Sequence, residues 1–164
     1  MPQGDRFDPV TYRFPSDYLY QPTYEWGAQV EFDPFWLVFP RTAALTAALN
    51  VSQSVNIPND ADFECRRILY HFDLAAAALT TATAFVPNVS ILITDSGSGR
   101  NLMNAAAPIG SIAMCENGAA KDLPWPKIFT RNSTVTLSIT NFDVAQTTGV
   151  LQVTLAGRKI FSRS

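Results

Sequence analysis

The stretch LNVSQSVNI, residues 49–57, decides the fold class because its apolar and polar residues alternate one by one. The apolar face holds Leu49, Val51, Val55 and Ile57, and the opposite face holds Asn50, Ser52, Ser54 and Asn56. Alternation with a period of 2, with β-branched residues on the apolar face, predicts a half-buried β-strand.

The same pattern recurs along the chain and predicts further strands over 63–72, 89–94, 132–140 and 150–156. Turn-forming residues separate them: PND at 58–60, DSGSG at 95–99, ENG at 116–118 and LPWP at 123–126. Short strands with a turn about every ten residues indicate an all-β protein, an antiparallel β-sandwich that is jelly-roll-like. The Ala-rich stretches 43–48 and 74–84 are compatible with a helical turn, which propensity alone does not decide.

Composition narrows the classes of partner. The 164 residues carry a net charge of −2, and only 16% are charged, against roughly 25% in an average soluble domain. The apolar fraction of 47% excludes disorder throughout, and the acidic balance argues against nucleic acid as a partner. No apolar run approaches the roughly 18 residues that span a bilayer, and the start MPQGDRFDPV lacks a secretory core, so we expect no membrane partner and synthesis in the cytoplasm. The sparse charge suggests a surface that other chains cover.

The first 34 residues differ from the rest of the chain. They carry six acids and two bases, five of the eleven prolines and four of the five tyrosines. Prolines about seven residues apart exclude a long helix or a central strand here. We therefore expect an extended N-terminal arm over 1–34 and a sandwich domain over 35–164. The arm either lies along a partner, with aromatic anchors in shallow pockets, or packs on its own domain as irregular coil.

Residues that commonly carry chemistry are few. His71 is the single histidine, and a Ser-His-Asp arrangement with Asp73 or Asp95 lacks the sequence context of a nucleophile. Cys65 and Cys115 with one histidine are too few for a four-ligand zinc site, and whether they pair stays open. We therefore expect no catalytic residue, no cofactor, no metal and no small-molecule substrate, so the chain is not expected to be an enzyme.

Four segments, taken in order, carry a resemblance: VNIPNDADFECRRIL (55–69), VSILITDSGSGRNLMNAAAPIGSIA (89–113), LPWPKIFTRNSTVTLSITNF (123–142) and VLQVTLAGRKIF (150–161). Over residues 50–161 the chain resembles the head decoration, or cement, proteins of tailed bacteriophages, which have a jelly-roll-like β-sandwich. The resemblance implies a structural virion protein that binds the outside of the capsid and stabilises it as a homo-oligomer. Its implied partners are the major capsid protein and further copies of the chain, and its implied location is the capsid exterior.

Such a protein needs an interface more than a pocket, so the candidate interface residues are aromatic residues of the first 36 positions and two arginines. They are Tyr12, Phe14, Tyr18, Tyr20, Tyr24, Trp26, Trp36, Arg66 and Arg67. Arg158 and Lys159 extend the possible basic patch that an acidic arm would complement. The alternatives are a tail, neck or head-fibre component, a carbohydrate-binding sandwich that stacks sugars on Tyr and Trp, and a hydrolase using His71.

Overall fold

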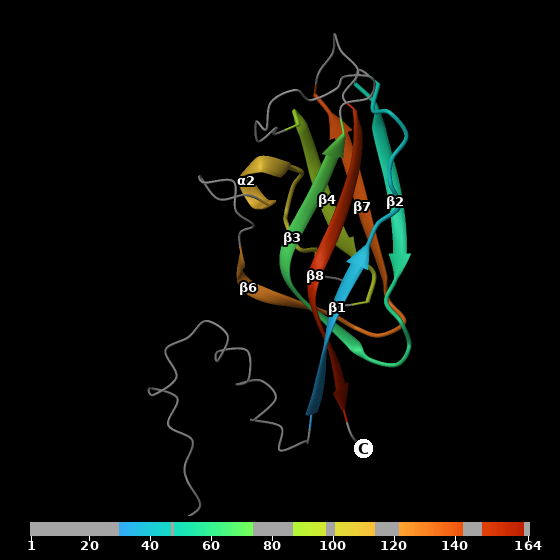
Figure 1. The fold of residues 1–164 in the computed structure, drawn as a ribbon, viewed down its shortest axis with the longest axis vertical. Helices are drawn as coiled ribbons and strands as arrows, with labels where there is room; N and C mark the ends of the chain where they lie inside the picture. The colour runs from blue at the N-terminus through green and yellow to red at the C-terminus, as the bar shows by residue number, and fades with distance from the viewer. Residues whose placement is uncertain are drawn as a thin grey trace, which may run out of the picture. The chain divides into compact units, whose positions relative to one another are not determined.

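The computed structural model describes residues 30–46, 48–73, 87–97, 101–113, 122–142 and 149–162. In these residues the elements follow one another along the chain as eight strands and one short helix (Figure 1): β1 Val30–Val38, β2 Asn50–Asn56, β3 Asp62–Asp73, β4 Val89–Asp95, β5 Ala107–Pro108, α2 Ile109–Ala113, β6 Asp122–Phe129, β7 Thr134–Asn141 and β8 Val150–Ser162. No helix among the described residues is long and apolar enough to cross a membrane.

The strands form two antiparallel sheets of four, in the orders β1-β8-β3-β6 and β2-β7-β4-β5. The strand pairs are nested along the sequence. β1 pairs with β8, β2 with β7, β3 with β6 and β4 with β5. This is the order produced when a long hairpin of eight strands is rolled into two layers, the jelly roll. The predicted all-β sandwich is confirmed.

The core lies between the two sheets and is built by the alternation visible in the sequence. β7 buries Val135, Leu137 and Ile139, and β8 buries Leu151, Val153 and Leu155 in the same alternating pattern. Phe63 of β3 lies at the centre of an aromatic group: its ring stacks on Phe129 of β6 at 6.2 Å and meets Phe35 of β1 edge-on at 5.5 Å. Each such fully buried side chain stabilises the fold by roughly 1.5–3 kcal/mol relative to exposure.

All five predicted strands are present as β2, β3, β4, β7 and β8, and β8 extends well beyond its predicted end. The prediction of a turn at LPWP, residues 123–126, is wrong, because these residues lie within β6. The register shows why the sequence misleads. Cys65 of β3 pairs with Lys127, and Arg67, two residues later, pairs with Asp122, five residues earlier in β6. The LPWP residues therefore bulge out of the ladder, and prolines can occupy such positions.

Prolines in the described strands lie only in the edge strands: Pro34 in β1, Pro108 in β5, and Pro124 and Pro126 in β6. An edge strand has one unpaired side, so a residue without an N–H can sit there without removing a hydrogen bond of the sheet. Because β1 lies at the edge of its sheet, it forms a strand although it contains Pro34. The predicted boundary between arm and domain, after Pro34, falls inside this strand.

The sequence did not decide whether the Ala-rich stretches 43–48 and 74–84 form a helical turn. The described residues of 43–48 form no helix: Leu45 makes an isolated bridge, and Ala48 adopts a positive φ of 54° in a turn. The stretch 74–84 lies outside the described residues. Residues Phe32–Phe161 form one compact unit.

Candidate interaction surface

The outward side of the β1-β8-β3-β6 sheet carries a carboxylate that is almost fully buried. Alternation along β3 directs Phe63 and Cys65 into the core and Glu64 to the opposite side, yet Glu64 is only 2% exposed. Its neighbours in the ladder are Arg158 of β8 and Ile128 of β6. A carboxylate removed from water must be compensated by charge and hydrogen bonds.

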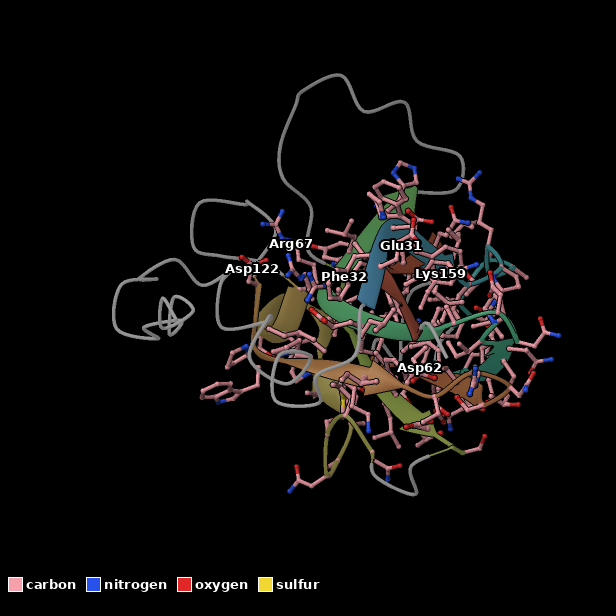
Figure 2. The ribbon with its side chains drawn as sticks, turned by 90° about the horizontal axis from the view of Figure 1, so that it is seen from below. Glu31, Phe32, Asp62, Arg67, Asp122 and Lys159 are labelled. Carbon is pink, nitrogen blue, oxygen red and sulfur yellow. The ribbon has the colours of Figure 1, made fainter. Side chains whose placement is uncertain are left out.

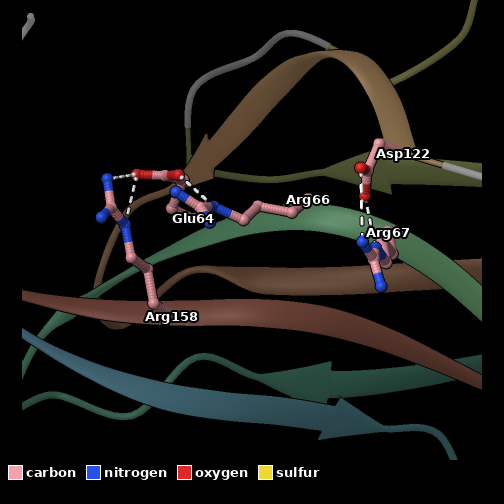
Figure 3. A network of polar contacts seen from close by, with 5 residues as sticks. All are labelled: Glu64, Arg66, Arg67, Asp122 and Arg158. Atoms are coloured by element: carbon pink, nitrogen blue, oxygen red, sulfur yellow. Dashed lines mark hydrogen bonds and ion pairs between the residues drawn. The ribbon is translucent and has the colours of Figure 1, made fainter. Parts of the chain in front are cut away.

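Two arginines supply that compensation (Figure 3). Glu64 Oε2 accepts hydrogen bonds from Arg158 Nε at 3.0 Å and Nη2 at 2.9 Å, and Oε1 accepts one from Arg66 Nε at 3.1 Å. The Arg158 guanidinium also lies 3.8 Å from the ring centroid of Phe32 in β1. Side-chain contacts therefore connect three strands across the sheet. A cation–π contact joins Phe32 of β1 to Arg158 of β8, and charge-assisted hydrogen bonds join Arg158 to Glu64 of β3.

A second row of outward side chains crosses the sheet beside the first. Arg67 of β3 pairs with Ala156 of β8 and with Asp122 of β6, and the Arg67 and Asp122 side chains form an ion pair (Figures 2 and 3). This hydrogen-bonded pair lowers the pKa of Asp122 and raises that of Arg67. On the other side, Phe39 N–H donates to Val153 O at 3.0 Å, and counting back along the antiparallel pair places Trp36 beside Ala156.

Both edges of this sheet present exposed tryptophans. Trp36 of β1 is 58% exposed and Trp125 of β6, in the LPWP bulge, is 77% exposed. Val38 and Ile128, in the same two strands, are 47% and 41% exposed. We call Trp36, Val38, Trp125 and Ile128 the edge apolar residues. Exposed aromatic residues are enriched in the core of surfaces that bind other proteins, where a polar rim surrounds them.

Two lysines of the β1-β8-β3-β6 sheet form ion pairs with carboxylates outside that sheet. Lys127 of β6 crosses between the sheets to Asp95 of β4, with Nζ 3.2 Å from Oδ2, and Asp95 also accepts a hydrogen bond from Gly97 N–H at 2.9 Å. Lys159 of β8 pairs with Asp60 at 2.6 Å, which lowers the pKa of that carboxyl. The two sheets are thus joined by a buried ion pair as well as by apolar packing.

Of the predicted interface residues, Tyr12, Phe14, Tyr18, Tyr20, Tyr24 and Trp26 lie outside the described residues. Trp36, Arg66 and Arg67 all belong to the β1-β8-β3-β6 sheet, where β8 separates the tryptophan from the arginines. Arg66 is half-buried against Glu64, whereas Arg67 is exposed beside Asp122.

The expected basic patch is largely neutralised. Arg66 and Arg158 share Glu64, Arg67 pairs with Asp122, and Lys159 pairs with Asp60, so four cations with three carboxylates leave one net positive charge. Sequence reasoning missed Glu64, Asp122 and Trp125. The period-2 pattern of β3 places Glu64 outward, but nothing in the sequence shows that Arg158, 94 residues away, lies opposite it.

Among the described residues, His71 of β3 and Asp95 of β4 belong to different sheets and are not brought together. His71 is exposed on β3 opposite Gln152, while Asp95 lies by Lys127, whose partner in β3 is Cys65. Cys65 and His71 pair with Gly157 and Gln152 of β8, which are five residues apart, so about 17 Å separates them along the strands. The side chain of Asp73, and all of Cys115, lie outside the described part. The Cys65 thiol donates to Arg67 O at 3.5 Å, and burial raises its pKa to about 12.

Among the described residues, no group of three or more His, Cys, Asp or Glu side chains is arranged to hold a metal ion. Comparison of the chain with protein-family models and with curated proteins found no match.

Proposed function

We propose that this chain is a structural, non-enzymatic subunit of a bacteriophage particle that binds the outside of the capsid and stabilises it as a decoration protein. The observation that carries the proposal is the pair of tryptophans, 58% and 77% exposed, on the two edge strands of one sheet. Tryptophan is among the residues most enriched at binding hot spots, and exposing two of them in water is unfavourable unless a partner covers them.

Two further features support this role. The jelly roll is an architecture that viral capsid domains use, although lectins and enzymes use it too, so the fold only raises the prior. In addition, side chains link the strands of the sheet that bears both tryptophans: Glu64 and Arg158 join β3 to β8, and the Arg67–Asp122 ion pair joins β3 to β6. A rigid platform with apolar edges suits a protein that ties neighbouring shell subunits together, because added contacts made only by the assembled shell stabilise it.

The arrangement favours a protein interface over a sugar-binding platform. Trp36 and Trp125 belong to opposite edge strands, with β8 and β3 between them, about 14 Å in the direction across the sheet. Sugar stacking needs aromatic rings in a continuous row, whereas two separated anchors fit contacts with two neighbouring subunits.

The test is co-sedimentation of the purified full chain with capsid shells of the phage that encodes it, followed by thermal disruption of the shells. We expect binding at a fixed copy number per major capsid protein and a higher disruption temperature. Trp36→Ala and Trp125→Ala are expected to weaken binding at least about tenfold, the usual scale of a hot-spot residue. Phe142→Ala, which removes a 52% exposed aromatic residue next to β7 of the other sheet, is the matched control.

Absence of the chain from the particles, or equal binding by all three variants, would contradict the proposal. The contribution of the predicted arm is tested separately by deleting residues 1–29. This end point leaves β1, which begins at Val30, intact. Unchanged shell binding by the truncated chain would remove the arm from the interface.

A further inference from the structure

One edge of the second sheet differs from every other edge of the sandwich. β2 lies at the margin of its sheet, and among the described strands it pairs with β7 alone (Figure 1). β1 carries Asp33 and Pro34, β6 carries charges and the LPWP bulge, and β5 is two residues long and ends in a proline. Charges, prolines, bulges and shortness are the devices that keep strand edges from pairing with other chains.

β2 has none of these devices. It is seven residues long, NVSQSVN, without a charge or a proline, and its register with β7 is unbroken from Asn50 to Asn56. An edge of this kind is a template for another strand. Because it carries no charge, a second copy of the same strand meets no like charge when it pairs.

The hydrogen bonds show which backbone groups face the free side. Asn141 N–H donates to Leu49 O, and Ile57 N–H donates to Ser133 O, so the odd-numbered residues of β2 point their backbone groups at β7. The even-numbered residues Asn50, Ser52, Ser54 and Asn56 therefore direct four N–H and four C=O groups away from the sheet. All four residues are exposed.

The sequence of β2 is the same in both directions about Gln53: N-V-S-Q-S-V-N. If two copies pair antiparallel about a twofold axis at Gln53, Ser52 lies opposite Ser54 of the second copy and Asn50 lies opposite Asn56. These are the residues whose backbone groups point outward, so all four N–H and four C=O groups of each copy find partners, giving eight hydrogen bonds. An axis at any other residue of β2 leaves some of them without a partner in the second β2.

Side chains match on both faces in this register. Val51 lies opposite Val55 of the second copy on the core side, and the serines and asparagines meet on the outer side. Gln53 Oε1 is buried and has no hydrogen-bond partner among the described residues. At the axis, the two Gln53 side chains lie opposite each other.

We propose that two copies of this chain associate through antiparallel pairing of β2 with β2 about a twofold axis at Gln53, joining two four-stranded sheets into one of eight strands. The interface is isologous, the commonest type in homo-oligomers. It is a property of the chain in solution and goes beyond the proposed function, since it does not require a capsid.

The first test is sedimentation equilibrium of the full chain, with Ser52→Pro compared with Ser52→Ala. The Ser52 N–H points away from β7, so proline removes a hydrogen bond to the second copy without removing one inside the sheet. We expect a wild-type dimer, an unchanged dimer for Ser52→Ala, and dimerisation at least about tenfold weaker for Ser52→Pro, with both variants folded by circular dichroism.

A charge-exchange experiment tests the register and remains decisive if the proline variant fails to fold. Position 52 of one copy faces position 54 of the other, so S52K/S54K and S52E/S54E are each expected to be monomeric by like-charge repulsion. Mixed in equal amounts, the two proteins are expected to recover the dimer, because each lysine then faces a glutamate.

A wild-type monomer at about 100 µM, a Ser52→Pro dimer of unchanged affinity, or a mixture that stays monomeric would each overturn the pairing. If the wild-type protein is monomeric and still binds shells, the β2 pairing is wrong and the proposed function is unaffected. Conversely, a β2-paired dimer that binds no shell would overturn the function alone.

Discussion

Replacing Glu64 by glutamine tests whether the carboxylate between two arginines holds the β1-β8-β3-β6 sheet together. Its side chain is 3% exposed, and that of Arg158 is 10% exposed. Removing one partner of a buried ion pair leaves the other charge uncompensated, which costs about 3–5 kcal/mol. The glutamine oxygen still accepts one hydrogen bond, so we expect Glu64→Gln to lower the free energy of unfolding by about 3 kcal/mol. For a chain of this size that corresponds to a Tm about 10 °C lower.

The assay is urea unfolding followed by far-UV circular dichroism, with a thermal melt as a second measurement. The control is Asp122→Asn, which makes the same chemical change in an ion pair whose side chains are 50% and 60% exposed. An exposed pair contributes less than about 1 kcal/mol, so this variant should be nearly as stable as the wild type. The double variant Glu64→Met/Arg158→Met should recover stability relative to Glu64→Gln, because it removes the buried Arg158 charge together with Glu64. Arg66, the other partner of Glu64, has a side chain that is 31% exposed, so water can solvate its charge.

The reasoning is refuted if Glu64→Gln and Asp122→Asn lose equal stability, or if Glu64→Gln loses less than about 1 kcal/mol. Either result would mean that water reaches Arg158 easily enough to replace the carboxylate. A double variant less stable than Glu64→Gln would show that the methionine side chains, rather than charge, decide the outcome.

Three further outcomes are expected. Gly157→Ala should lower the free energy of unfolding by several kcal/mol or yield insoluble protein, because a Cβ there would lie 1.8 Å from Glu64 O and force β8 away from β3; a melting temperature within about 3 °C of wild type would contradict this. Arg67 lowers the pKa of Asp122, so the pair contributes its full stabilisation above the ordinary carboxyl pKa of about 4 and loses it as pH falls through the lowered pKa. The small stability difference between wild type and Asp122→Asn, below about 1 kcal/mol, should therefore shrink and vanish as pH is lowered below about 4 in urea titrations. In a Cys115→Ser variant, Cys65 should react with a thiol reagent at pH 8 only as fast as the protein unfolds, since burial raises its pKa to about 12; rapid labelling of the folded protein would refute its burial.

The sequence by itself determined the class of fold and the positions of five of the eight described strands. Alternation with a period of 2 depends only on local order along the chain, so β2, β4 and β7 could be located to within a residue or two. β1 and β6 escaped prediction because prolines signal breaks in a strand, and only the position of a strand at the edge of a sheet makes them acceptable.

The tertiary structure decided the character of the surface. Arg66, Arg67, Arg158 and Lys159 predicted a basic patch, but carboxylates neutralise most of it, and for Arg67, Arg158 and Lys159 these carboxylates are distant in the sequence. From the sequence alone, Trp125 is as compatible with the core as with the surface. In the structure it lies in the bulge of β6 and is exposed. Burial and ion pairing are set by contacts between strands 50 to 100 residues apart in the chain, whereas local alternation fixes only which way each side chain points. For this reason the sequence could predict a β-sandwich, and only the paired sheets could show which of its edges and side chains are open to partners.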